Sequence, residues 1–202
     1  MNFGRMVNKK IETENNIYEA GMKLFQEKGF TNTTMQDISE RAGVAKSTIF
    51  NYFSSKEEII LRFGRNQVAQ LKKFAQSLPP DMDTKAKILE VLQEDVGGVE
   101  KSKEIARISL VESYKSDWVY TLEAQNRVEL ASVYAQILCD GQKKGDIRDG
   151  LNCEHIAGLI VAIYFHALYT GMEVDTDINI KDYIIYSLEV LWNGVSCCEF
   201  FT

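Results

Sequence analysis

Residues 46–53, KSTIFNYF, place four hydrogen-bonding side chains on one side of a predicted helix. A helical wheel groups these four at about 100° to 240° from Lys46: Ser47, Thr48, Asn51 and Tyr52. Hydroxyl and amide groups without negative charge can bind phosphates and base edges, as a helix entering a DNA major groove must. A merely solvated helix face has the same pattern, so the wheel alone leaves both interpretations open.

The other side of this helix is apolar. Ile49, Phe50 and Phe53 fall within one narrow sector, and we expect all three to pack against neighbouring helices. Lys46 lies in the first turn, where its long side chain can reach either side.

Two preceding elements are needed to hold such a helix. A stripe of small and apolar residues predicts an amphipathic helix over 11–28 that Gly29 ends: Ile17, Ala20, Gly21, Leu24, Phe25. A second helix is expected over 35–42, with Thr34 as N-cap and Asp37 completing a capping box. Only residues 43–45 remain for a turn before Lys46. The spacing predicts a helix-turn-helix.

The rest of the chain is also predicted to be helical. Ser54 and Glu57 have capping-box spacing, and a long helix is expected over 55–77, before Pro79 and Pro80. Further helices are expected over 84–96, 102–114, 118–144, 153–170 and 181–193. The predicted fold is therefore all-α, with about nine helices. Residues 1–10 are polar and basic and are expected to form a flexible arm.

Charge and composition narrow the function classes. Net charge is −6, yet residues 1–56 hold eight Lys/Arg against six Asp/Glu. A mildly basic front hints at a nucleic-acid-facing end, although a solvated surface explains it equally well. The four cysteines have no CxxC spacing and no secretory signal precedes them, which favours a reduced cytoplasmic protein. The uncharged run 155–172 is barely long enough to span a membrane and is interpreted as a buried helix.

The last two predicted helices are apolar on nearly every face, so one chain alone is not expected to cover them. A second copy of the chain would do so, which predicts a homodimer. The expected interface residues are Ile156, Ile160, Ile163, Ile184, Leu188 and Leu191.

Residues 17–59 closely resemble the DNA-binding domain of the TetR family of transcriptional regulators. The framework LF.EKGF..TTM.DI...AGV.K.T.F.YF..KE is present without gaps. The resemblance implies a DNA-binding domain over 11–56 and a ligand-binding and dimerisation domain over 57–202. It also implies a repressor that a small-molecule effector releases from double-stranded operator DNA, through movement of the helix over 55–77.

The resemblance also assigns roles to single residues. Thr34 matches a phosphate contact, Gln36 lies beside it as a base reader, and Lys56 stands where a phosphate would meet a helix N-terminus. Tyr52 matches a backbone-contacting position. The remaining positions face bases in the family: Lys46, Ser47, Thr48 and Asn51.

Three positions depart from the family pattern. Phe50 replaces a frequent Tyr and so lacks a hydroxyl that would reach a phosphate. Ala45 stands where Ser or Thr usually caps the recognition helix, which forgoes about 1 kcal/mol of capping. Ser47 replaces a frequent Gly and adds a side chain that can read or exclude a base.

Six residues lie where effectors bind in the family: Arg107, Tyr114, Trp118, Phe165, His166 and Tyr169. Aromatic residues on helices are more often plain core residues, and His166 is expected to be a satisfied core histidine. Cys139 or the pair Cys197 and Cys198 could sense redox state, but inert cysteines are the simpler interpretation.

Other function classes have weaker support. His155 and His166 are about 16 Å apart along a helix and cannot share a metal ion, so no metal or cofactor is expected. The sequence contains no GxSxG, P-loop, GxGxxG or HExxH motif, which disfavours an enzyme without excluding one. A DNA-architectural or purely protein-binding module would not need so large an apolar C-terminal region.

Overall fold

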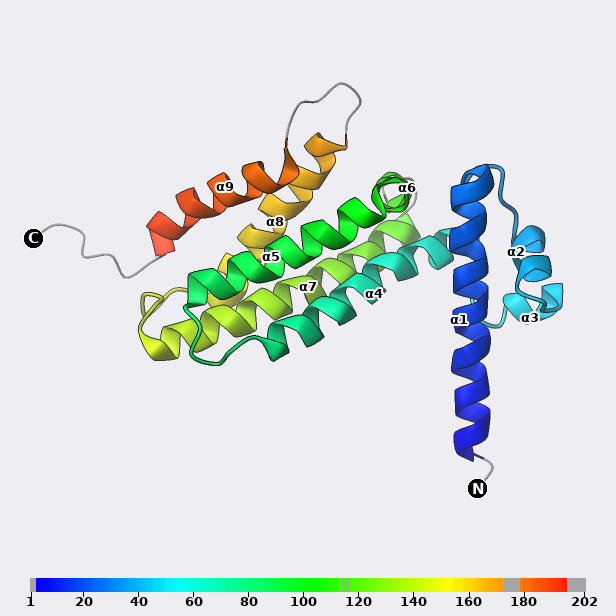
Figure 1. Ribbon diagram of the computed structural model, residues 1–202, viewed down its shortest axis with the longest axis horizontal. Coiled ribbons are helices and arrows are strands. Elements are labelled where there is room, and N and C mark those ends of the chain that lie inside the picture. Colours follow the sequence, from blue (N-terminus) through cyan, green and yellow to red (C-terminus); the bar gives the residue numbers. More distant parts are fainter. Residues whose placement is uncertain (1–2, 114, 116, 173–178, 196–202) are drawn as a thin grey trace, which may run out of the picture. The chain divides into compact units, whose positions relative to one another are not determined.

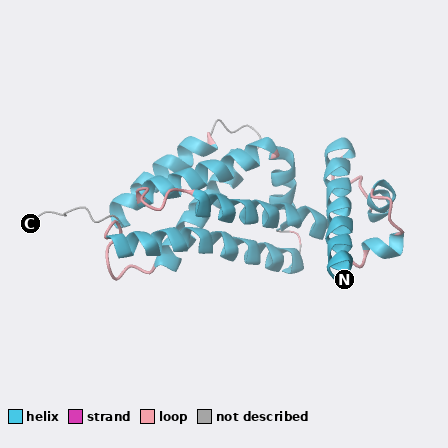
Figure 2. Cartoon of the chain, turned by 60° about the horizontal axis from the view of Figure 1, so that its bottom comes forward, coloured by secondary structure: helices cyan, strands magenta, loops and turns pink. Residues whose placement is uncertain are grey.

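The computed structural model describes residues 3–113, 115, 117–172 and 179–195. Over this part of the chain the regular structure is helical and contains no strand (Figure 2). The helices are α1 (Phe3–Lys28), α2 (Met35–Arg41), α3 (Lys46–Ile49), α4 (Lys56–Ser77), α5 (Thr84–Lys101), α6 (Lys103–Ser113), α7 (Asp117–Lys144), α8 (Cys153–Gly171) and α9 (Ile180–Val195) (Figure 1). The predicted all-α class is confirmed.

The chain divides into two compact units. The first comprises residues 1–65 and 102–123, and the second comprises 66–101 and 124–202. Helices α4 and α7 each contribute residues to both units. The predicted functional boundary after residue 56 stays a prediction, and it differs from these compact units because α6 and the start of α7 belong to the first one.

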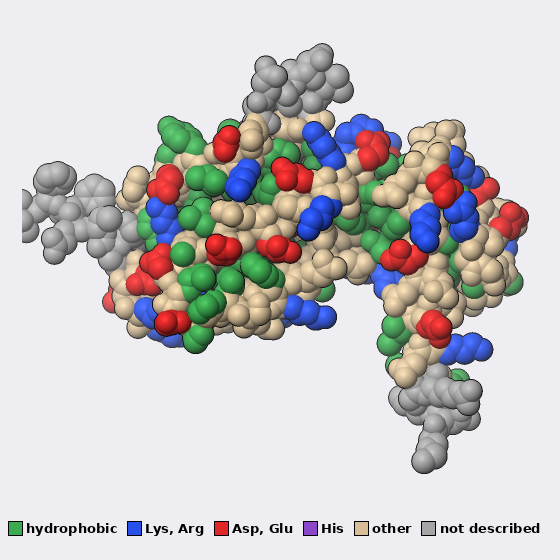
Figure 3. All heavy atoms as spheres, viewed as in Figure 1, with side chains coloured by type: hydrophobic (Ala, Val, Ile, Leu, Met, Phe, Trp, Pro, Cys, Tyr) green, Lys and Arg blue, Asp and Glu red, His purple; other side chains and the backbone are tan. Residues whose placement is uncertain are grey.

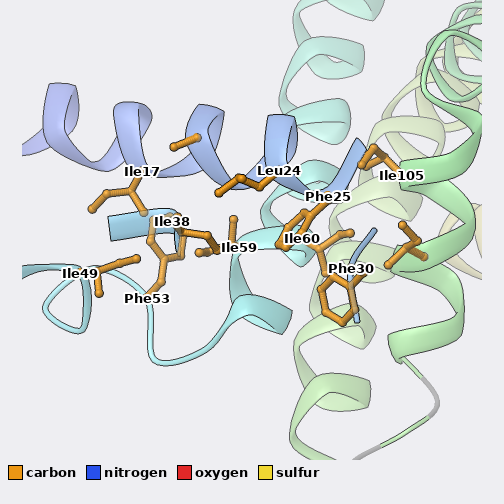
Figure 4. Close-up of a cluster of buried hydrophobic side chains, with 12 residues drawn as sticks. Ile17, Leu24, Phe25, Phe30, Ile38, Ile49, Phe53, Ile59, Ile60 and Ile105 are labelled. Atoms are coloured by element: carbon orange, nitrogen blue, oxygen red, sulfur yellow. The ribbon is translucent and has the colours of Figure 1, made fainter. Parts of the chain in front are cut away.

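In the first unit, α1, α2, α3, α6 and the start of α4 surround one apolar core. Figure 4 shows Ile49 and Phe53 lying toward Ile17 and Ile38, with Ile105 of α6 at the far end of the cluster. These side chains are at most 2% exposed. Their burial is the main stabilising contribution to the unit.

Close helix contact in this unit depends on Gly21 of α1. A Cβ there would lie 2.8 Å from Cγ2 of Ile59 on α4, too near for two carbon atoms. Gly29 then ends the helix with φ +82°, a conformation that L side chains rarely adopt, and its N–H donates to the Phe25 carbonyl. The predicted end of this helix is confirmed.

The start of α1 differs from the prediction. Residues 3–10 form the first turns of the helix, where a flexible arm was expected. The segment contains no proline, and the Thr13 hydroxyl donates to the Lys9 carbonyl. Met6, Val7 and Ile11 remain exposed on these turns. Helix propensity therefore outweighs the polar composition of this end.

In the second unit, α8 and α9 pack on each other and α9 also packs on α5. One face of α8 is buried, through Ile156, Ile160 and Tyr164. Of the described helices, only α8 is long and apolar enough to cross a membrane, with 44% of its apolar window buried, which is weak support for a membrane span. Side chains of both charge signs and apolar side chains are mixed on the face in Figure 3.

Candidate nucleic-acid interface

The start of α2 is fixed by a capping box. The Asp37 N–H donates to the Thr34 hydroxyl (3.1 Å), while the Thr34 N–H and hydroxyl both donate to Asp37 Oδ2 at 2.7 and 2.6 Å. Lys28 lies 2.8 Å from the same oxygen, and together with the Thr34 bonds it lowers the pKa of Asp37. The predicted cap is confirmed. A phosphate contact by Thr34 would require its proton to be shared with Asp37.

Gln36 is the second residue of α2, and its side chain is exposed. Its amide nitrogen donates to the Glu40 carboxylate at 2.7 Å, one turn along the helix. Because both side chains are exposed, the pair is weak and can separate when another partner is offered. The amide is thus accessible, as a base-reading role requires.

Helix α3 is short and follows a tight turn. Gly43 has φ +67°, and Ala45 caps the helix without a side-chain hydrogen bond, as the sequence indicates. Within α3, Ile49 is fully buried, whereas Lys46 and Ser47 are exposed and Thr48 is half-buried.

The side chains of Phe50 and Tyr52, which follow α3, lie on other sides than predicted. Phe50 is 49% exposed, although it was expected in the buried seam, and Tyr52 is half-buried against the core, although it was expected outside. The helix ends at Ile49, and the N–H groups of Asn51 and Tyr52 donate to the carbonyls three residues earlier. Such turns rotate by about 120° per residue, so a 100° wheel misplaces these side chains. Asn51 is exposed as predicted.

Lys56 has a structural position. Its ammonium donates to the carbonyl oxygens of Phe30 (2.8 Å), Thr33 (3.1 Å) and Thr31 (3.4 Å), and it lies 4.5 Å from the Phe30 ring centroid. The side chain thereby ties the start of α4 to the loop before α2. Three donors are already used, so this geometry does not support the predicted phosphate contact.

A groove of about 750 Å³ lies between the start of α1 and the α2–α3 region. Lys9, Lys10 and Thr13 line it from α1, and Thr48 and Tyr52 line it from the other side. The sequence marked the first ten residues as basic but did not place them beside α3. The signal was the helical spacing of Met6, Lys9, Lys10 and Thr13, which puts them on neighbouring positions of one surface.

The residues predicted for effector binding belong to two different units, and their role stays a prediction. Arg107 is exposed and paired with Glu104, and Trp118 is 46% exposed; both belong to the first unit. In the second unit Phe165 is half-buried, while His166 and Tyr169 are exposed. A core position for His166 was therefore wrong, because it lies on the solvent side of α8. Tyr114 lies outside the described residues.

The predicted dimer residues are mostly internal. Ile156, Ile160, Ile184 and Leu188 are at most 5% exposed because α8, α9 and α5 cover them, while Ile163 and Leu191 are half-buried. The exposed side of α8 instead follows a spacing of three and four residues: Leu159, Ala162, His166, Tyr169. Tyr186 and Val190 are exposed on α9.

No group of three or more metal-ligating side chains occurs among the described residues. Burial raises the pKa of Cys153 to about 11, which keeps it a thiol and fits the inert interpretation. Cys139 is half-buried, and Cys197 and Cys198 lie outside the described residues.

Comparison with known proteins agrees with this architecture. Residues 17–63 match the family model of bacterial regulatory proteins of the tetR family. A fatty acid metabolism regulator protein of Bacillus subtilis is 22% identical over 185 residues, 89% of this chain and 93% of the relative.

Solved structures share the fold. FadR of Thermus thermophilus, a TetR-family repressor in complex with lauroyl-CoA, superposes with a TM-score of 0.81 at 21% identity, over 94% of this chain and 98% of that one. FadR of Bacillus subtilis, in complex with stearoyl-CoA, has a TM-score of 0.70 at 20% identity, over 89% and 97%.

Proposed function

The chain belongs to the TetR family of transcriptional regulators, and we propose that α3 and the groove beside it form its operator-binding surface. Members of this family are ligand-regulated DNA-binding proteins and not enzymes. The observation that carries the proposal is the division of one short segment into two faces. Ile49 and Phe53 lie in the core, while Lys46, Ser47 and Asn51 are exposed with no negative charge among them.

Base reading falls to the exposed side chains of α3. The Asn51 amide can form a bidentate pair with adenine, and Ser47 can donate to or accept from either kind of base pair. Lys46 supplies positive charge at the start of the helix. Thr48 is half-buried and lies at the edge of the groove, which suits a phosphate contact better than a base contact.

The groove beside α3 adds backbone contacts. Lys9 and Lys10 have no ion-pair partner among the described residues, and Thr13 and Tyr52 add hydroxyl groups beside them. A sugar-phosphate strand entering this groove would meet two cations and two hydroxyls. Lys56 is left out of the proposed set because its donors hold the Phe30–Thr33 loop.

A homodimer is proposed to place two copies of α3 on one duplex. Successive major grooves on one side of B-DNA are about 34–36 Å apart, so operator binding depends on the spacing of the two copies. The exposed apolar side chains of α8 and α9 would form the interface: Leu159, Tyr169, Tyr186 and Val190.

A matched pair of variants tests the dimer. Tyr186→Glu should yield monomers in analytical ultracentrifugation and abolish operator binding, because it buries a charge at the interface. Val128→Glu introduces the same charge at an exposed apolar position of α7 and should leave a dimer. Dimers of both variants would contradict this interface.

An effector bound in the second unit is proposed to change the spacing between the two α3 helices of the dimer. Helix α4 contributes its first residues to the first unit and the rest to the second. A shift of its second half would therefore displace the first unit, which carries α3. An acyl-CoA is the first class to test, because two proteins that share the fold are complexes with acyl-CoA. The site of action is proposed to be the cytoplasm, where operator DNA is available.

A gel-shift series tests this function. The operator is obtained by selecting bound duplexes from a random pool, and lauroyl-CoA is then titrated against the complex. We expect release of the duplex as lauroyl-CoA increases, with free coenzyme A as the inactive control. Binding of lauroyl-CoA in calorimetry with unchanged operator affinity would contradict the proposed switch.

A further inference from the structure

Three polar side chains from three helices meet in the interior of the second unit. Asp95 lies on α5, Tyr134 on α7 and Tyr164 on α8, and their exposed fractions are 4%, 0% and 4%. The Tyr164 hydroxyl is hydrogen-bonded to the Asp95 carboxyl. The residues one turn away on these helices are buried and apolar: Leu92, Val99, Leu130, Leu138, Ile160, Leu168.

Two atoms of this cluster have no hydrogen-bond partner among the residues that the structure describes. They are Oδ2 of Asp95 and the hydroxyl oxygen of Tyr134, each with less than 1 Å² of accessible surface. None of the ion pairs in the described part of the chain involves Asp95, and burial raises its pKa to about 7. Buried polar atoms without partners are rare and costly in folded proteins. The cluster therefore has hydrogen-bonding capacity that a bound group could satisfy.

The chemistry of the two atoms defines a matching group. Asp95 Oδ2 needs a donor, and the Tyr134 hydroxyl can donate to an acceptor. An uncharged amide or hydroxyl offers both at once, whereas a carboxylate offers no donor and repels the ionised form of Asp95, which prevails above about pH 7. A body of hydrocarbon around that group suits the apolar neighbours.

We propose that Asp95, Tyr134 and Tyr164 form the polar subsite of the effector site and bind an uncharged amide or hydroxyl of an otherwise apolar effector. The inference rests on the proposed effector binding and adds the chemistry of the recognised group. The group enters between α5, α7 and α8, the three helices that supply the subsite. Within the acyl-CoA class, the pantetheine amides are groups of this kind.

Octanamide and octanoate test the subsite, because they have the same size and differ in charge and in the N–H donor. Calorimetry at about pH 8, where octanoate is ionised, needs no DNA, so its outcome is independent of operator binding. We expect the full chain to bind octanamide at least about tenfold more tightly than octanoate, as a site with buried polar groups discriminates. Asp95→Asn should remove this preference.

A second variant separates recognition from folding. Tyr134→Phe removes only the unpartnered hydroxyl, so we expect equal or higher thermal stability together with at least about tenfold weaker octanamide binding. Tyr183→Phe, on a half-buried ring of α9, is the matched control and should bind octanamide as the parent chain does. Failure of the parent chain to bind octanamide, or equal affinity for octanoate, overturns the subsite. So does an undiminished preference in Asp95→Asn or undiminished affinity in Tyr134→Phe.

Discussion

The half-buried Lys56 of the first unit donates three hydrogen bonds to loop carbonyls, whereas Asp95 in the core of the second unit keeps one oxygen without a partner. Both groups are ionisable and both lie beside aromatic rings. The first unit thus uses a charge to fix the loop before α2. The second unit contains a buried polar oxygen whose hydrogen-bonding capacity is not satisfied. This difference fits the two proposals, a fixed DNA-binding surface in the first unit and an effector site in the core of the second.

The largest expected effect on stability comes from the core of the first unit. Phe53→Ala removes a ring that is 2% exposed and should lower the free energy of unfolding by about 3–5 kcal/mol. Phe50→Ala, three residues earlier, removes a ring that is 49% exposed and should cost less than about 1 kcal/mol. Urea unfolding followed by circular dichroism measures both. Equal losses would place the two rings differently from the structure.

The opposite sign is expected in the second unit. The folded-state pKa of Asp95, about 7, lies above its usual 3.8, so the folded state holds a proton that the unfolded state releases between these values. Asp95 therefore lowers stability progressively as pH rises from about 4 to 7, by an order of 4 kcal/mol at most. Asp95→Asn should gain stability over the parent chain across this window, with a constant advantage above it. A constant difference from pH 4 to 8 would contradict the burial of an ionisable group.

A smaller effect on stability is expected from the hydrogen bonds between Lys56 and the loop before α2. Lys56→Met keeps the length of the side chain but removes the three donors, which should cost about 1–3 kcal/mol of unfolding free energy. Lys46→Met removes an exposed ammonium of α3 and should leave the unfolding free energy within about 0.5 kcal/mol. If Lys56→Met weakened only DNA binding, the lysine would be a phosphate contact after all.

The smallest effect concerns the groove lysines. Lys9→Gln and Lys10→Gln should each reduce the slope of log K against log salt by about 1, since each removes one phosphate contact. Lys103→Gln, an exposed lysine of α6, is the control with an unchanged slope. Gel shifts at several salt concentrations provide the slopes, and identical slopes in all three variants would exclude the groove from the interface.

Sequence patterns predicted the elements of the first unit because local signals agree there. The box between Thr34 and Asp37 and the glycine at 29 act within a few residues, so spacing alone locates them. The positions of Phe50 and Tyr52 were wrong because a helix of four residues ends before the wheel can apply.

Tertiary contacts account for what the sequence could not provide. The three carbonyls on Lys56 come from residues more than twenty positions earlier, and no local pattern indicates them. Ile156 and Leu188 were assigned to a partner because their helices are apolar all round, yet α5, α8 and α9 cover them within the chain. The Asp95 cluster joins three distant helices and has no sequence signature.

Base reading by α3 is tested most directly by selecting duplexes from a random pool with the parent chain and with Asn51→Ala. The parent chain should select one operator and bind it about a thousandfold or more above random duplex. Asn51→Ala should lose about 1–3 kcal/mol of discrimination at one base pair of each half-site, while keeping its fold and its nonspecific affinity. An unchanged selected sequence for Asn51→Ala and also for Ser47→Ala would contradict the proposed reading surface.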